Sequence, residues 1–167
     1  MEKGIIAVYC GMGKGKSAVA IGQAIQAVGQ GKSVIVIQFL KGKDTAELGF
    51  LDRLEPEIKL FRFEKFERYY EDLSEEEKQE EIQNIKNGLN FARKVLATEG
   101  CDLLILDEIL GVVNQNIITV EELKAILDAR HKEMDILMTG YSVPEDLKDA
   151  VDVITTLETS TLHETES

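Results

Sequence analysis

The chain has 167 residues, of which 44% are hydrophobic and 30% are charged, and it contains 13 glycines but only two prolines. This composition predicts one globular domain, residues 1–167, and excludes a disordered, collagen-like or disulfide-stapled chain. Thirty-one acidic residues against 19 basic ones give a net charge of −12, which argues against binding to a phosphate backbone and therefore against a nucleic-acid partner.

The cysteines and the apolar runs predict a location. Cys10 and Cys101 stand far apart, with no metal-ligand spacing around either. Isolated thiols are typical of reduced, intracellular proteins. No apolar run reaches the roughly 18 residues of a membrane span, and the N-terminus lacks the pattern of a signal peptide. We therefore expect a cytoplasmic protein without a membrane partner.

The first part of the chain alternates strand-like and helix-like segments. Residues 5–9 predict a strand, and residues 16–28 predict a helix. Its apolar residues near helical spacing are Val19, Ile21, Ala24, Ile25 and Val28. The β-branched run at residues 33–39 predicts a second strand, buried on both faces. Parallel α/β units produce this order of elements.

The middle of the chain predicts a weak strand, an irregular segment and a long helix. Residues 58–63 have the alternation of a third strand. Residues 64–73 are acidic and irregular, and we expect a lid or excursion there. Ser74 followed by acidic residues is typical of a helix N-terminus. That helix is expected to reach Ala97, with the acidic residues of 75–81 in solvent.

The second half predicts three more strands. Residues 102–108 form an apolar run that ends in two carboxylates, and Thr119 opens a helix with a capping-box pattern. Residues 134–139 predict a fifth strand, residues 144–150 a short helix, and residues 151–157 a sixth strand. The expected fold is α/β with three layers and a mainly parallel central sheet of about six strands, in which ligands bind at the carboxyl ends of the strands.

A glycine-rich loop carries the strongest chemical signal. Residues 10–17 read Cys-Gly-Met-Gly-Lys-Gly-Lys-Ser and match the end of the phosphate-loop pattern G-x-x-x-x-G-K-[ST], with Cys10 at its first glycine. Loop amides and the following helix would receive phosphate. Lys16 would contact the terminal phosphates, and the Ser17 hydroxyl would ligate Mg²⁺ or Mn²⁺. The alternative is a glycine-rich turn with two solvated lysines, but the order strand, loop, helix favours a P-loop nucleotide-binding fold. The candidate nucleotide-binding residues are Gly11, Met12, Gly13, Lys14, Gly15, Lys16 and Ser17.

Two carboxylates end the fourth expected strand. Asp107 could hold the metal through water, and Glu108 could orient a ligand or act as a base. The alternative is that both acids merely close a buried strand and cap the next turn. Together with the phosphate loop, the pair favours a functional role.

Taken together, these motifs resemble the phosphate-loop type of ATP:corrinoid adenosyltransferases. The loop of that family reads T-G-x-G-K-G-K-[ST] and also lacks the first glycine of the general pattern. The similarity covers about residues 4–157. The further matching residues are Gln38-Phe-Leu-Lys-Gly42, Glu47, Leu106-Asp-Glu108, Asn114, Thr139-Gly140, Pro144 and Asp152.

The resemblance implies transfer of the 5′-deoxyadenosyl group of ATP to the cobalt of a Co(I) corrinoid, with release of triphosphate. Since the corrinoid is itself the nucleophile, the protein would supply alignment and stabilise the leaving triphosphate. Lys14, Lys16, the loop amides and Mg²⁺ on Ser17 suit that task. Lys41 could also approach the phosphates, or could equally be a solvated lysine at a strand end.

The family is understood to use aromatic side chains to exclude the lower axial ligand of cobalt. Phe66 matches the phenylalanine of that segment, whereas Arg68 stands at the position of its tryptophan. Tyr69 or Tyr70 could substitute for that ring, and packing of a lid is the alternative for all three aromatic residues. Tyr141 replaces the arginine of the T-G-R element of the family.

The resemblance also implies a flavoprotein as electron donor and a homodimer. Two other functions stay open at this point. One is a P-loop ATPase on the same scaffold with a lost or altered corrinoid site, in which Glu108 would serve as the base. The other is a nucleotide-binding protein without turnover. The product distinguishes them, because transfer releases triphosphate and hydrolysis releases ADP.

Overall fold

The structure is a computed structural model that describes residues 3–40, 53–63, 66 and 68–164. Six strands form one sheet in the order β3-β2-β4-β5-β1-β6, and all five strand pairs are parallel. The expectation of an α/β fold with a mainly parallel six-stranded sheet is confirmed. The strands are β1 (Ile6–Cys10), β2 (Val34–Gln38), β3 (Ile58–Arg62), β4 (Leu103–Asp107), β5 (Asp135–Thr139) and β6 (Val153–Thr156).

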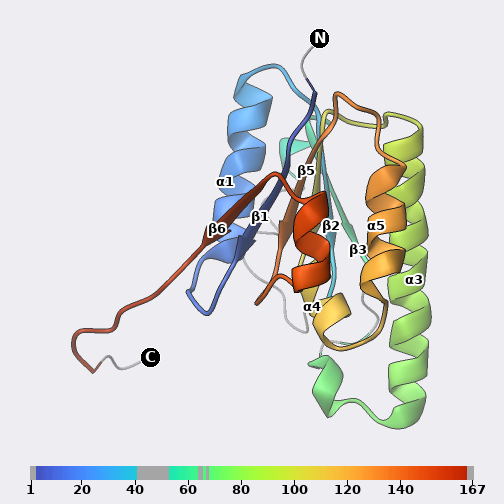
Figure 1. Cartoon of the computed structure of the whole chain (residues 1–167), viewed down its shortest axis with the longest axis vertical. Coiled ribbons are helices and arrows are strands. Elements are labelled where there is room, and N and C mark those ends of the chain that lie inside the picture. Colours follow the sequence, from blue (N-terminus) through green and yellow to red (C-terminus); the bar gives the residue numbers. More distant parts are fainter. Residues whose placement is uncertain (1–2, 41–52, 64–65, 67, 165–167) are drawn as a thin grey trace.

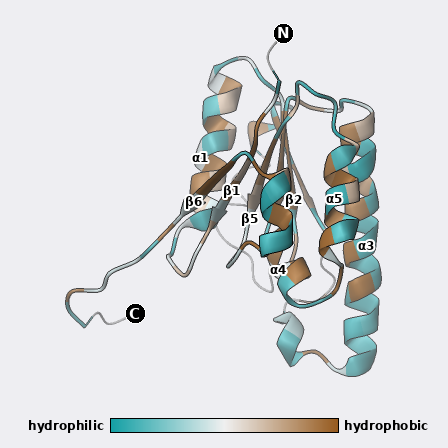
Figure 2. Cartoon of the chain, in the orientation of Figure 1, coloured by the Kyte–Doolittle hydropathy of each residue, from teal (hydrophilic) through white to brown (hydrophobic). Residues whose placement is uncertain are grey.

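Helices cover both faces of this sheet (Figure 1). Helix α1 lies on one face, and α3 and α5 lie on the other. Figure 2 shows that the sheet between them is apolar, while the helices turn polar residues outward. The three layers therefore enclose two apolar cores, one on each side of the sheet. The helices are α1 (Lys16–Gly29), α3 (Glu75–Ala97), α4 (Ile109–Asn114), α5 (Val120–Asp128) and the 3₁₀ helices η2 (Tyr70–Asp72) and η3 (Glu145–Ala150).

Two short helices differ from the sequence expectations. Helix α4 was not predicted, because six residues with two valines and a glycine have weak helical propensity. It forms directly after β4, where burial of its apolar side chains stabilises the turn. The segment expected as a short helix near residue 144 is a 3₁₀ helix.

The most deeply buried residues of helix α1 are alanines, and Ile21 and Val28 pack beside them. Ala20, Ala24 and Ala27 are at most 7% exposed, whereas Ile25 is 52% exposed. Of the residues at helical spacing, Ala24 is therefore on the packing face, whereas Ile25 is turned to solvent. Alanines three or four residues apart let the backbone of α1 approach the sheet closely. This close approach determines which face of α1 is buried.

Helix α3 begins as expected and differs in one residue. Ser74 and Glu77 form a complete capping box, in which each side chain accepts a hydrogen bond from the backbone of the other. Glu81, expected in solvent, is 4% exposed, and its carboxylate accepts a hydrogen bond from the backbone N–H of Phe66 at 3.3 Å. At α5 the Thr119 side chain accepts from the backbone N–H of Glu122.

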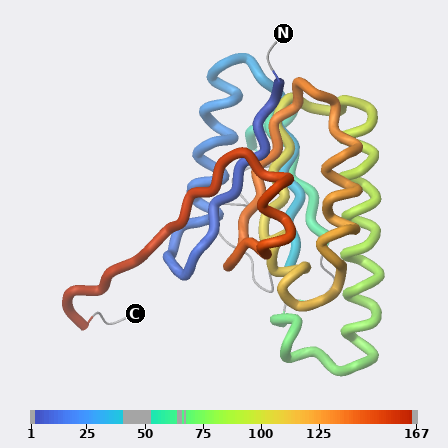
Figure 3. Tube along the Cα trace, in the orientation of Figure 1, coloured from blue at the N-terminus to red at the C-terminus, as the bar shows by residue number. Residues whose placement is uncertain are grey.

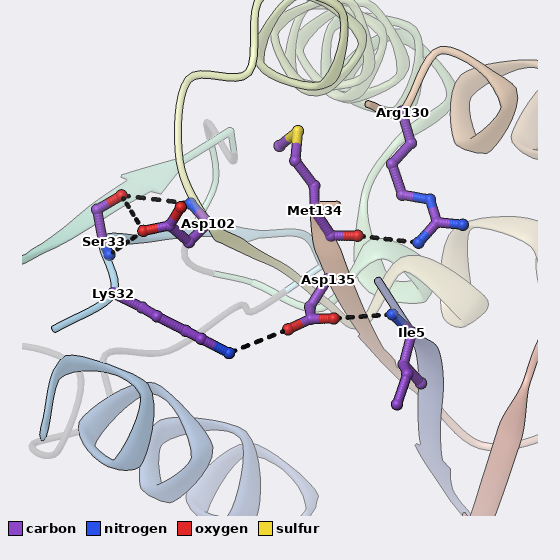
Figure 4. Close-up of polar contacts among 7 residues, drawn as sticks. All are labelled: Ile5, Lys32, Ser33, Asp102, Arg130, Met134 and Asp135. Atoms are coloured by element: carbon purple, nitrogen blue, oxygen red, sulfur yellow. Dashed lines mark hydrogen bonds and ion pairs between the residues drawn. The ribbon is translucent and has the colours of Figure 1, made fainter. Parts of the chain in front are cut away.

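Polar contacts join the loops at the amino-terminal edge of the sheet (Figure 4). The Asp102 carboxylate accepts hydrogen bonds from the backbone and the hydroxyl of Ser33. Asp135 accepts from the backbone N–H of Ile5 at 2.7 Å and lies 3.6 Å from the Lys32 ammonium. The polar groups of the phosphate loop and of Asp107 lie at the opposite, carboxyl edge.

Among the described residues, no helix combines the length and the apolar character that a membrane crossing requires.

Candidate functional site

The phosphate loop joins β1 to α1 at the carboxyl edge of the sheet. Gly15 has φ +95°, a left-handed conformation that favours glycine, and it is the N-cap of α1. Lys16, the first helical residue, turns back over the loop, and its ammonium group donates to the carbonyls of Gly11 at 2.9 Å and Gly13 at 3.1 Å. The lysine charge is thus held at the positive end of a helix, where an anion is favoured.

The chain after β6 runs along the phosphate loop and then away from the sheet (Figure 3). The backbone N–H of Gly13 donates to the carbonyl of Leu157 at 2.9 Å, and that of Lys14 donates to the Thr159 hydroxyl at 2.8 Å. These two loop amides, expected to converge on phosphate, have protein partners in this structure. No sequence motif indicated this contact.

The same segment explains two of the loop glycines. A Cβ atom at Gly11 would lie 2.5 Å from the carbonyl oxygen of Leu157, and one at Gly13 would lie 2.6 Å from that residue's backbone. At Gly15, by contrast, no described atom lies within 4 Å of the Cβ position. Gly11 and Gly13 therefore accommodate the C-terminal segment, while Gly15 leaves open space at the start of α1.

Asp107 is the centre of a buried polar network at the end of β4. Its carboxylate is 2% exposed and lies 3.1 Å from the Ser17 hydroxyl at both oxygens. The Thr139 hydroxyl donates to Oδ1 at 2.7 Å, and the Gln38 amide donates to Oδ2 at 3.4 Å. The loop, β2, β4 and β5 thus meet at one carboxylate.

Gln38 has a buried acceptor without a partner. Its side chain is 1% exposed, and Oε1 finds no hydrogen-bond donor among the described residues. Because the carboxylate of Asp107 can only accept, the NH₂ group of Gln38 must face it, and Oε1 must face elsewhere. Buried acceptors without a donor are uncommon in proteins. This one lies beside the network in which the sequence predicts a metal.

Glu108 follows Asp107 in a strained backbone conformation. Its φ of +64° is unusual for a residue other than glycine. Its backbone N–H donates to the Thr139 hydroxyl at 2.8 Å, and it is the N-cap of α4. The side chain is half-buried, so the sharp turn directs the chain into α4 without burying the second carboxylate completely.

The aromatic segment lies at the other end of the same edge. The strand order puts β3 four strand spacings from β1, about 19 Å at the usual separation. Phe66 follows β3 and is half-buried, while Tyr69 is 54% exposed. Burial, and then the negative charge of Glu75, raise the pKa of the Tyr70 phenol. The strand that precedes the aromatic segment is thus separated from the strand that precedes the phosphate loop by roughly the width of four strands.

The remaining predicted residues are spread around the loop. Met12 is 78% exposed, and Lys14 is exposed as well. Tyr141 is 55% exposed, and its carbonyl accepts the backbone N–H of Gly11 at 2.9 Å. Lys41 lies outside the described residues.

Comparison with known proteins identifies the family. The family model described as ATP:corrinoid adenosyltransferase BtuR/CobO/CobP matches residues 2–166. The chain is 31% identical to the corrinoid adenosyltransferase of Escherichia coli K12, covering 93% of this chain and 77% of that protein. It is 32% identical to corrinoid adenosyltransferase CobA of Salmonella typhimurium LT2, with the same coverage. The corrinoid adenosyltransferase of Pseudomonas aeruginosa PAO1 is 28% identical, covering 92% of this chain and 74% of that protein.

A solved structure supports the fold alone. The KaiC-like protein PH0186 of Pyrococcus horikoshii OT3 superposes with a TM-score of 0.57 at 13% identity, covering 96% of this chain and 76% of that one. The match of the family model over nearly the whole length, together with relatives above 30% identity, decides the assignment. The chain belongs to the ATP:corrinoid adenosyltransferase family.

Proposed function

We propose that this chain transfers the 5′-deoxyadenosyl group of ATP to the cobalt of a Co(I) corrinoid and releases triphosphate. The observation that carries the site assignment is the contact between Ser17 and Asp107 beside a loop over which Lys16 is folded. In the transfer, the electron pair of Co(I) forms a bond to the ribose C5′. The C5′–oxygen bond breaks, and its electron pair leaves with the triphosphate.

The residues at the loop fit Mg²⁺ or Mn²⁺. In the described part of the chain, no three His, Cys, Asp or Glu side chains gather into a metal cage. Mg²⁺ usually binds through one or two protein oxygens, substrate phosphates and water, and Ser17 with Asp107 supplies such a set. Gln38 Oε1, for which the described residues supply no donor, would add an acceptor beside this pair. The metal would neutralise charge on the phosphates.

The other proposed roles follow from charge. Lys16 and Lys14 would stabilise the negative charge that develops on the leaving triphosphate, and the first turn of α1 would add its N–H groups. Lys41 would assist from the chain beyond β2. The protein needs no nucleophile of its own, so Glu108 would orient a ligand rather than attack.

Phe66 is the proposed wall of the corrinoid site. A corrinoid is wide and flat, and the aromatic segment lies on the carboxyl edge at a distance from the loop. An apolar ring at this place would disfavour a polar lower ligand on cobalt. The segment 64–73 would then serve as the lid over that half of the site.

Three further proposals concern the setting of the reaction. A flavoprotein would supply the electron that makes Co(I). A homodimer is supported by the family, and the edge strand β6 exposes Val153 and Ile154. A reducing cytoplasm suits the two free thiols, Cys10 and Cys101, both of which are buried. Burial raises the pKa of the Cys101 thiol to about 12.

An anaerobic incubation of the protein with Mg-ATP and chemically reduced Co(I) cobalamin tests the proposed reaction. We expect a light-sensitive cobalt–carbon product and triphosphate in equal amounts. ADP in place of triphosphate would indicate the ATPase alternative, with Glu108 as its base. Binding of ATP without either product would indicate a nucleotide-binding protein.

A further inference from the structure

We propose that Gln38 and Thr139 are positioning residues that hold the carboxylate of Asp107, and we call this pair the Asp107 clamp. The clamp holds the Asp107 carboxylate in the position where it accepts the proton of the Ser17 hydroxyl. The lone pairs of the Ser17 oxygen are then left for the metal. The inference rests on the metal role of Ser17 and Asp107 in the proposed function. It adds two residues to that site and states what each one does.

The hydrogen-bond direction at Thr139 is fixed by chemistry. Its hydroxyl accepts the backbone N–H of Glu108 at 2.8 Å, so its own proton is available for Asp107 Oδ1 at 2.7 Å. The carboxylate cannot donate in return. Thr139 is fully buried, and it links the side chain of one acid to the backbone of the next. One hydroxyl therefore sets both the Asp107 rotamer and the turn at Glu108.

Gln38 holds the second oxygen of the same carboxylate. Its amide lies 3.4 Å from Oδ2, and it reaches Asp107 from β2, the strand on the other side of β4 from β5. A donor on each side opposes rotation of the carboxylate. Among the described residues, the Gln38 side chain makes one long hydrogen bond, and Oε1 has no donor. Such a glutamine is a poor choice for packing alone, because an apolar side chain would avoid the unpaired acceptor.

The fixed carboxylate determines how the hydroxyl of Ser17 is oriented. A serine hydroxyl has one proton, which it can give to only one oxygen of Asp107 at a time although both lie at 3.1 Å. While the carboxylate is held, that proton is always accepted and the lone pairs face away from Asp107. Outer partners of this kind orient metal ligands, and their loss commonly costs about 10- to 100-fold in metal affinity or activity.

Thr155 provides a matched comparison within the sheet. Both Thr139 and Thr155 are paired with Tyr9, in neighbouring strands on its two sides, so they lie at the same level of the sheet. Thr155 is exposed at the edge strand, whereas Thr139 is buried against Asp107. Both substitutions replace the hydroxyl of a strand threonine by a methyl group, but only the change at Thr139 removes a partner of the carboxylate.

The decisive quantity is a ratio of two ATP dissociation constants, both measured by calorimetry. The constant measured in EDTA, without metal, is divided by the constant measured with Mn²⁺. This ratio reports how much the metal tightens ATP binding, independently of turnover. Thr139→Val and Gln38→Met should each lower the ratio about tenfold and leave the affinity in EDTA unchanged. Thr139→Ser, which keeps the hydroxyl, should restore the ratio, and Thr155→Val should not change it.

The outcomes separate the clamp from the metal site on which it rests. If Asp107→Asn does not lower the ratio, the metal site is wrong and the clamp with it. If Asp107→Asn lowers the ratio while Thr139→Val and Gln38→Met do not, the metal site stands and the clamp is wrong. Equal losses with and without Mn²⁺ would also overturn the clamp, because they would mean general damage. Should Thr139→Val not fold, Gln38→Met decides.

Discussion

The hydroxyl of Ser17 lies 3.1 Å from both carboxylate oxygens of Asp107, although 90 positions separate the two residues. Ser17 stands in the first turn of α1, and Asp107 ends β4. Strand β5 lies between β4 and β1, so the helix must begin over the carboxyl edge for the two side chains to meet. The glycine-rich turn that starts α1 therefore also creates the contact on which the metal proposal depends.

Lys16→Ala is expected to weaken ATP binding by about tenfold to a hundredfold, the usual value of a hydrogen bond to a charged group. In the described part of the chain, the Lys16 ammonium donates to the loop carbonyls of Gly11 and Gly13, and phosphate would give it an anion. Calorimetric titration with Mg-ATP measures the change. Lys32→Ala is the control, because that lysine pairs with Asp135 at the opposite edge of the sheet. Near-normal affinity in Lys16→Ala would contradict the loop assignment.

Most of the sheet could be predicted from the sequence because its strands are buried. Val34–Gln38 and Leu103–Asp107 are each buried along their whole length, and such strands have continuous apolar runs in the sequence. The capping box at Ser74 is likewise a local signal. Helix α4 and the packing face of α1 depend on contacts with the sheet, which no local pattern contains.

The residues of the candidate site could likewise be predicted only in part. The phosphate loop and the two acids carry motifs, and the structure brings Ser17 to Asp107. Gln38 and Thr139 belong to stretches that match the family, but no local pattern gave them a role, and only the strand order makes them neighbours of that carboxylate. The contact of Leu157 with Gly13 could not be predicted either, because it depends on where β6 joins the sheet.

Gly13→Ala is expected to lower the free energy of unfolding by about 1–3 kcal/mol, as overpacking usually does. The new Cβ would lie 2.6 Å from the backbone of Leu157, so either the loop or the C-terminal segment must move. Gly22→Ala is the matched substitution, since no described atom lies within 4 Å of that Cβ position in the middle of α1. It should raise the free energy by about 0.5–1 kcal/mol. Urea unfolding compares the two, and a stable Gly13→Ala protein would contradict the contact.

Glu77 is expected to make the start of α3 sensitive to acid. The hydrogen bond from the backbone N–H of Ser74, aided by the Ser74 hydroxyl and by Arg68, lowers the pKa of the Glu77 carboxyl below 4.5. A depressed folded pKa gives stability that is complete above the unfolded value and is lost as the pH falls through the lower folded value. Glu77→Gln should therefore lose less stability than the wild type on acidification from neutral pH.

The measurement for Glu77 is the urea midpoint at about pH 7 and about pH 3.5, on either side of the ordinary carboxyl pKa. Glu76→Gln serves as the control, because Glu76 is exposed in the same helical turn. If the wild type and Glu77→Gln lose the same stability between the two pH values, the capping carboxylate does not contribute to the acid sensitivity.

Phe66→Ala is expected to slow the reaction from a Co(II) corrinoid with a reductase far more than the reaction from preformed Co(I). Phe66 follows β3, whereas the phosphate loop follows β1, four strand positions away in the sheet, so the loss of the Phe66 ring should leave ATP binding and the transfer step nearly intact. Its proposed task is to exclude the lower ligand of cobalt, which matters only before Co(I) is made. Asp72→Ala, at an exposed position of the same segment for which no role in the corrinoid site is proposed, controls for disturbance of the segment. Equal losses in the two assays would mean that Phe66 supports the fold of the lid and does not act on the axial ligand.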